Sequence, residues 1–145
     1  MFEKIIRICN NTKALNRDVI FKKVFDNKGV QQQVVDLNQS QMYDDGVDSK
    51  GDSLGKYSPF TIALKEKKGQ RIDHITLKDT GEFYGSMQVK AQRDEIIVSA
   101  DMKKPDTDLE VIYPNALGLN EKSLSEIRDF TKPLFIEEVR KAIFA

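Results

Sequence analysis

The sequence predicts an α+β domain, in which N-terminal helices and a C-terminal helix pack on an antiparallel sheet. Three observations carry this prediction. Apolar residues recur at helical spacing within the first forty residues, they alternate with polar residues over 86–92 and 95–102, and they return to helical spacing near residue 143. The length of 145 residues suits a single domain, 1–145, with a core of its own.

The N-terminal region is predicted to form two helices, or one helix broken near Gly29. An apolar patch comes first, formed by Ile5, Ile6, Ile8 and Cys9. Thr12 or Asn16 could cap the helix that follows, because both side chains accept hydrogen bonds from free amides. That helix carries one apolar face, made by Ile20, Phe21, Val24 and Phe25. Gly29 is expected to end it, and a second stripe runs through Val30, Val34, Leu37 and Gln41.

Three strands are predicted for the sheet. Residues 86–92 and 95–102 alternate between apolar and polar, and the polar residues Gln92 to Glu95 between them indicate a hairpin. Residues 60–65 alternate as well, with Phe60, Ile62 and Leu64 on one side, and are predicted to add a further strand.

The last third is predicted to return to helix. Thr107 could cap a short helix that ends near Tyr113. Ser123 and Glu126 match a capping box, and Pro133 predicts a kink or a restart with Thr131 as the new cap. An amphipathic closing helix follows and is expected to pack on the sheet, with an apolar face of Phe135, Val139, Ala142 and Ile143.

The composition of the chain argues against several classes of function. Lys plus Arg and Asp plus Glu both number 23, and this balance argues against a dedicated nucleic-acid binder. No apolar run approaches the ~20 residues of a membrane span, and the first residues lack the pattern of a signal peptide. A single cysteine, Cys9, excludes an internal disulfide and a cysteine-rich metal site. We therefore expect synthesis in a cytosol and no membrane partner.

Residues 42–57 are predicted to form a flexible, turn-rich loop. Its aspartates raise the possibility of a calcium site, but only one of the three ligand positions before each glycine is acidic, Asp45 before Gly46 and Asp48 before Gly51, so neither register is complete. We therefore expect no metal and no cofactor. An alternative remains open, in which Asp44, Asp45 and Asp48 act with His74, the only histidine, in a small metal-assisted hydrolase or nuclease.

Residues 80–89 (TGEFYGSMQV) resemble the pattern T-G-x-L/F-x-x-S-I/F-x-V, with Met87 at the Ile/Phe position. Tyr113 and Gly118 follow in order, and residues 128–133 (RDFTKP) approximate an Arg-Phe-x-x-Pro helix start with one extra residue. In these features, the chain from Thr76 onward resembles the small tail-completion and head–tail joining proteins of tailed bacteriophages. Residues 39–48 (QSQMYDDGVD) also resemble small phage proteins of gut bacteria.

This resemblance implies a structural virion protein without an active site. It would be made in the cytoplasm of the bacterial host and act at the head–tail neck or the tail end. The resemblance also implies a ring of identical copies, commonly six, in contact with other phage neck or tail proteins. A third function class, a host-directed binding module, is also open.

Two loops are predicted to carry the assembly contacts, Met42–Tyr57 and Glu66–Arg71. Loops on a rigid sheet are where binding residues concentrate, and these two have little apolar surface to bury within one chain. The expected apolar anchors are Tyr43, Val47, Leu54 and Tyr57. The expected ionic contacts to a partner come from Lys67, Lys68 and Arg71.

Overall fold

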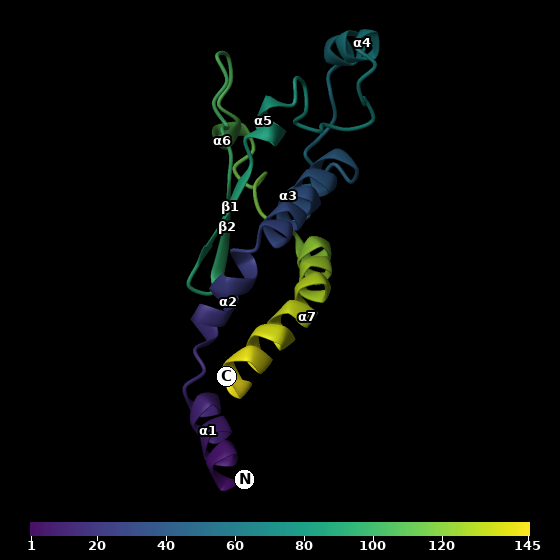
Figure 1. Ribbon diagram of the computed structural model, residues 1–145. Helices are drawn as coiled ribbons and strands as arrows, with labels where there is room; N and C mark the ends of the chain where they lie inside the picture. The colour runs from purple at the N-terminus through teal and green to yellow at the C-terminus, as the bar shows by residue number, and fades with distance from the viewer.

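The computed structural model describes residues 1–145 and confirms the α+β class. The elements are α1 (Phe2–Lys13), α2 (Arg17–Phe25), α3 (Lys28–Tyr43), α4 (Pro59–Lys67), α5 (Glu82–Gly85), β1 (Gln88–Gln92), β2 (Glu95–Ser99), α6 (Leu109–Ile112) and α7 (Glu121–Phe144). Figure 1 shows an elongated molecule, with α1 at one end and α4 at the other. No stretch of helix combines the length and the apolar character that crossing a bilayer requires.

The N-terminal region forms three helices, α1, α2 and α3, where two were predicted. The predicted break near Gly29 is confirmed, but Gly29 does not end a helix. Of the two candidate caps, Asn16 caps α2, because its side chain accepts from the amides of Asp18 and Val19, whereas the Thr12 hydroxyl donates to the carbonyl of Ile8 within α1. The break falls at Asn27, whose side chain accepts from the amide of Gly29 at 2.8 Å and so starts α3. Gly29 therefore lies in the first turn of α3.

The predicted hairpin is confirmed, with shorter strands. β1 and β2 pair antiparallel with Val89 opposite Val98 and Ala91 opposite Ile96, and these side chains face the helices. The sheet contains these two strands and no other.

The strand predicted at 60–65 is wrong, because this segment is helix α4. Ser58 caps the helix by accepting from the amide of Thr61 at 3.2 Å, and Pro59 occupies its first turn. A serine followed by proline is a strong helix start. The alternating apolar residues consequently spread around the helix, and Phe60 is left exposed.

Helices α6 and α7 also start at other residues than predicted. Asp108 caps α6 in place of Thr107. Asn120 caps α7, one turn before Ser123, by accepting from the Ser123 amide at 3.0 Å. Pro133 lies inside α7, which neither ends nor restarts there, and the Thr131 hydroxyl donates back to the carbonyl of Ile127 at 2.7 Å.

Two apolar clusters form the core. The first joins α2, α3, α7 and the hairpin, with Val24, Phe25, Val34, Ala91 and Ile127 among its buried members. The second joins α3 to α5, α6 and the 42–57 loop, with Met42, Leu54, Phe83, Tyr84 and Leu109 among its buried members. Helix α7 packs mainly along α1, α2 and α3, and it reaches the hairpin through the first cluster.

Candidate functional site

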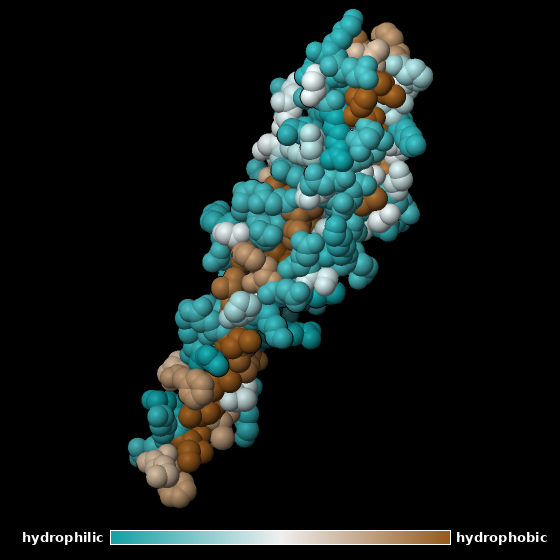
Figure 2. All heavy atoms as spheres, turned by 90° about the vertical axis from the view of Figure 1, so that its right-hand side faces the viewer, coloured by the Kyte–Doolittle hydropathy of each residue, from teal (hydrophilic) through white to brown (hydrophobic).

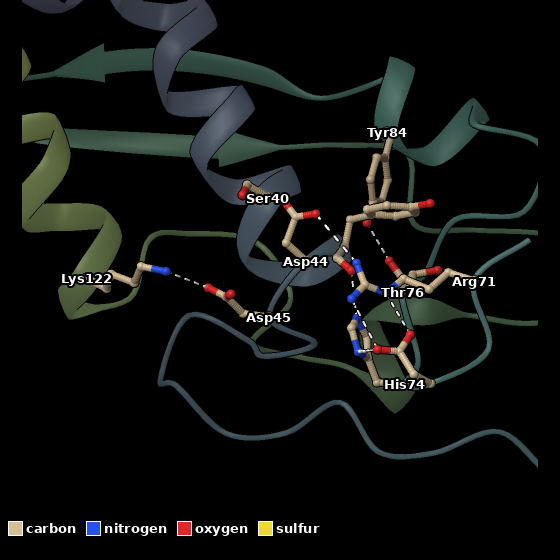
Figure 3. Close-up of polar contacts among 10 residues, drawn as sticks. Ser40, Asp44, Asp45, Arg71, His74, Thr76, Tyr84 and Lys122 are labelled. Atoms are coloured by element: carbon tan, nitrogen blue, oxygen red, sulfur yellow. Dashed lines mark hydrogen bonds and ion pairs between the residues drawn. The ribbon is translucent and has the colours of Figure 1, made fainter.

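The structure brings Tyr43 and Arg71 together, although one ends α3 and the other follows α4. The guanidinium of Arg71 lies 5.5 Å from the centre of the Tyr43 ring and 3.6 Å from the Asp44 carboxylate. It also donates two hydrogen bonds to Asp73, of 2.6 and 3.1 Å. Figure 3 shows Arg71 beside Asp44 and His74. The hydrogen bond from Arg71 lowers the pKa of Asp73 to about 2. Arg71 is thus already held by partners within its own chain.

His74 connects this group of residues to the 42–57 loop. Its Nε2 lies 2.7 Å from the carbonyl oxygen of Tyr43, and its Nδ1 lies 3.2 Å from the Asp73 carboxylate. The ring also packs on Gly46. These contacts join the loop to the segment after α4, which is a structural role for the only histidine.

The aspartates of the proposed hydrolase site bind different partners. Asp44 accepts from the Ser40 hydroxyl at 2.7 Å, and Asp45 pairs with Lys122 of α7 at 3.2 Å (Figure 3). Asp48 accepts from the amides of Lys50 and Asp52 and thereby shapes a turn. No three His, Cys, Asp or Glu side chains lie together in an arrangement that could hold a metal ion. The geometry therefore gives no specific support to the hydrolase alternative.

The remaining predicted anchors differ in exposure. Leu54 is buried in the second cluster, and its amide donates to the Gly46 carbonyl at 2.8 Å, so its side chain is not on the surface. Val47 and Tyr57 are half-buried. Lys67 is exposed and makes no ion pair, whereas Lys68 pairs with Asp79 at 3.1 Å. The flexibility expected for residues 42–57 stays a prediction, which hydrogen exchange at the Val47 and Leu54 amides would test.

A buried polar cluster is centred on Thr76, in the segment that follows α4. The Thr76 amide donates to the Tyr57 hydroxyl at 3.0 Å, and its carbonyl accepts from the Tyr84 hydroxyl at 2.5 Å. Thr76 is only 2% exposed, so water cannot replace either bond. Through Tyr57 and Tyr84 the cluster connects the segments before and after α4 with α5, and Figure 3 shows the contact of Thr76 with Tyr84.

Replacing Tyr84 by phenylalanine is expected to destabilise the fold by about 1–3 kcal/mol, because the Thr76 carbonyl loses its partner. Burial raises the pKa of Tyr84. The wild type should therefore lose stability as the pH rises above about 10, where the unfolded chain begins to release the tyrosine proton. The Phe variant should show a shallower loss. Urea titrations between pH 7 and 11 measure both effects.

Tyr43→Phe serves as the control for this substitution, because the contacts of Tyr43 with Arg71 and Lys78 are made by its ring. Equal stabilities of the two variants at pH 7 would contradict the role given to the Tyr84 hydroxyl.

Helix α1 presents an apolar face that nothing in the chain covers. No residue of α1 is buried, and Phe2, Ile5 and Ile6 are 79%, 49% and 59% exposed. The helix is attached to α7 through Asn11, whose side chain donates to the Ile143 carbonyl at 2.9 Å. Asn11 lies on the opposite side of α1 from Phe2. Figure 2 shows a hydrophobic band over this end of the molecule.

The whole chain also exposes more surface than its mass predicts. Its accessible surface is 9731 Å². A compact folded monomer of 16.6 kDa is expected to expose about 7,600 Å². The elongated shape accounts for the difference, because α1 and α4 extend away from the two clusters (Figure 1).

Sequence reasoning found the apolar residues of α1 but not their exposure. Spacing shows that Ile5, Ile6 and Cys9 share one side of a helix. Whether another element covers that side depends on where the chain folds back, and the sequence pattern does not specify this.

Comparisons of the chain with protein-family models, with curated proteins and with solved structures found no match.

Proposed function

We propose that this chain is a non-enzymatic structural protein of a tailed-phage virion, acting at the head–tail neck or the tail end as a connector or tail-completion protein. It works by assembling with copies of itself into a ring, for which the resemblance implies six copies, and by contacting other neck or tail proteins. The resemblance of residues 80–89 and 128–133 to this class supports the virion assignment.

The uncovered apolar face of α1 is the observation that carries the assembly part of the proposal. The side chains of Phe2, Ile5 and Ile6, together with the adjacent Met1, expose on the order of 500 Å² of surface. Each partner in a standard protein interface contributes roughly 800 Å². One such face per copy is therefore close to what a stable contact between two copies needs.

The elongated shape favours a head-to-tail contact. The α1 face lies at one end of the molecule, whereas α4, Lys67 and the Arg71 group lie toward the other (Figure 1). A contact between two different patches repeats from copy to copy and closes into a ring when the rotation allows it. Lys67 makes no ion pair within its chain and is free to meet an acidic group of a partner. Salt should weaken that interaction.

Replacing Ile5 by lysine is expected to weaken self-association at least tenfold, because an apolar anchor is lost and a charge would be buried in the contact. Ser125→Lys is the matched control, since it adds the same charge to an exposed residue of α7 that lies about five turns before Ile143, where α1 is attached. Sedimentation velocity and light scattering would measure the mass of each variant. A wild type that stays monomeric at roughly 100 µM, far above the Kd of a specific contact, would contradict self-assembly.

The virion assignment has a separate test. Mass spectrometry of purified phage particles should detect the chain, and antibody labelling should place it at the neck or tail end. An association-competent chain that is missing from intact particles would contradict the virion role and leave self-assembly standing.

A further inference from the structure

A pocket of about 250 Å³ lies between α4, the segment 75–79, the turn at 104–107 and α6. One wall is apolar and is formed by Ile75, Leu77, Leu109 and Ile112. The pocket is somewhat smaller than the roughly 300–1,000 Å³ typical of sites for drug-sized ligands. It therefore suits a compact group.

Lys65 of α4 supplies the pocket with a buried positive charge. The residue is only 9% exposed. Its ammonium donates to the side-chain oxygen of Gln70 at 3.2 Å and to the carbonyl of Lys78 at 3.3 Å, and it lies 4.8 Å from the Tyr57 ring. All these partners are neutral, and no carboxylate forms a direct ion pair with the ammonium. The Asp79 carboxylate is near enough for Lys65 to help lower its pKa, but Asp79 is bonded to Lys68 and Gln70. A buried cation without a direct counterion is unfavourable, so an anion beside it would be stabilised.

Further donors surround the same space. The ammonium of Lys104 forms no ion pair, and the hydroxyls of Thr107 and Tyr113 form no hydrogen bond within the protein. Asp79 also lines the pocket, but its carboxylate is engaged by Lys68 at 3.1 Å and by Gln70 at 3.2 Å. The pocket therefore combines an apolar wall with free donors and an excess of positive charge.

We propose that this pocket binds an organic carboxylate with a small apolar body. The carboxylate lies between Lys65, Lys104 and Thr107, where it can accept charge-assisted hydrogen bonds. The apolar body packs on Ile75 and Leu109. Inorganic phosphate would meet the cations but leave that wall in contact with water, so an organic acid fits better. This site is independent of the ring assembly proposed above.

NMR titration of the full chain with benzoate tests the proposal. Benzoate should give saturable shifts of the amides of Leu77 and Leu109, and benzamide, its neutral counterpart, should bind at least tenfold more weakly. Inorganic phosphate should also bind more weakly than benzoate. Equal binding of benzoate and benzamide, or no saturable shift, would overturn the carboxylate site.

Substitutions of single lysines test whether the buried charge of Lys65 is responsible for the binding of benzoate. Lys65→Met keeps the length of the stem and removes the charge, and it should weaken benzoate binding at least tenfold. Lys104→Met, on the rim, is a second variant that leaves the buried site intact and should weaken binding severalfold. Lys67→Met, an exposed residue of the same helix that does not line the pocket, is the control and should bind as the wild type does. If both the Lys65 and the Lys104 variants bound benzoate as tightly as the wild type, the proposed site would be wrong.

A second titration identifies the source of the carboxylate. The probes are the capped tripeptide Ala-Glu-Ala and its Ala-Gln-Ala counterpart. Tighter binding of the acidic peptide than of benzoate would support an acidic side chain presented by a partner protein. Tighter binding of benzoate would support a free small acid.

Discussion

Replacing Asn38 by alanine is expected to destabilise the fold by about 3–5 kcal/mol, the largest effect of any single substitution considered. The Asn38 side chain is fully buried on α3. Its amide group donates to the carbonyl of Ala116 at 3.0 Å, and its oxygen accepts from the amide of Gly118 at 2.9 Å. Alanine would leave both backbone groups buried without partners and would open a cavity as well.

Gln41, one turn later on α3, continues the same connection. Its amide group donates to the Gly118 carbonyl at 2.6 Å, and its oxygen accepts from the Asn120 amide and the Ser123 hydroxyl. Asn120 is the cap of α7. Asn38 and Gln41 therefore attach the segment before α7 to α3, and their loss should loosen the start of the C-terminal helix.

Urea unfolding followed by circular dichroism measures the effect of the Asn38 substitution. Gln32→Ala is the control, because Gln32 is exposed on the same helix and bonds only to the side chain of Asp36; its expected cost is below about 0.5 kcal/mol. Asn38→Leu restores the volume but not the hydrogen bonds, so it should remain about 2 kcal/mol or more below the wild type. Full stability of the leucine variant would show that packing, not hydrogen bonding, is the role of Asn38.

Replacing Gly46 by alanine is expected to destabilise the fold by about 2–4 kcal/mol. Gly46 has a φ of 65°, which disfavours any residue with a Cβ. A Cβ at this position would also lie 2.6 Å from the ring carbons of His74. The ring cannot simply turn aside, because Tyr43 and Asp73 hold its two nitrogens.

Gly51→Ala is the matched control in the same loop. Its φ is 82°, but no atom lies within 4 Å of the added Cβ, so it should cost only about 1 kcal/mol. Thermal melts would compare the two variants, and hydrogen exchange at the Val47 amide would report on loosening of the loop. Equal costs for the two alanines would show that the His74 contact is unimportant.

Local patterns in the sequence determined much of the secondary structure. The i, i+4 pairs Ile20–Val24 and Phe21–Phe25 indicated α2, and the alternation around Val89 and Val98 indicated the hairpin. These patterns work because a helix or a strand with one buried face repeats its apolar residues at its own period. Asn16 was predictable as one of two candidate caps, because capping involves only residues that are neighbours in the sequence.

Features that depend on partners far along the chain could not be predicted from local patterns. Residues 60–65 alternate like a strand, yet a strand needs a neighbour to pair with, and Ser58 and Pro59 start a helix instead. In the sequence, Gln41 is a polar residue on a helical stripe. It is buried because it forms hydrogen bonds with segment 118–123, which lies far along the chain. The uncovered face of α1 and the pocket around Lys65 likewise arise from where the chain folds back, because burial is set by contacts between segments rather than by local periodicity.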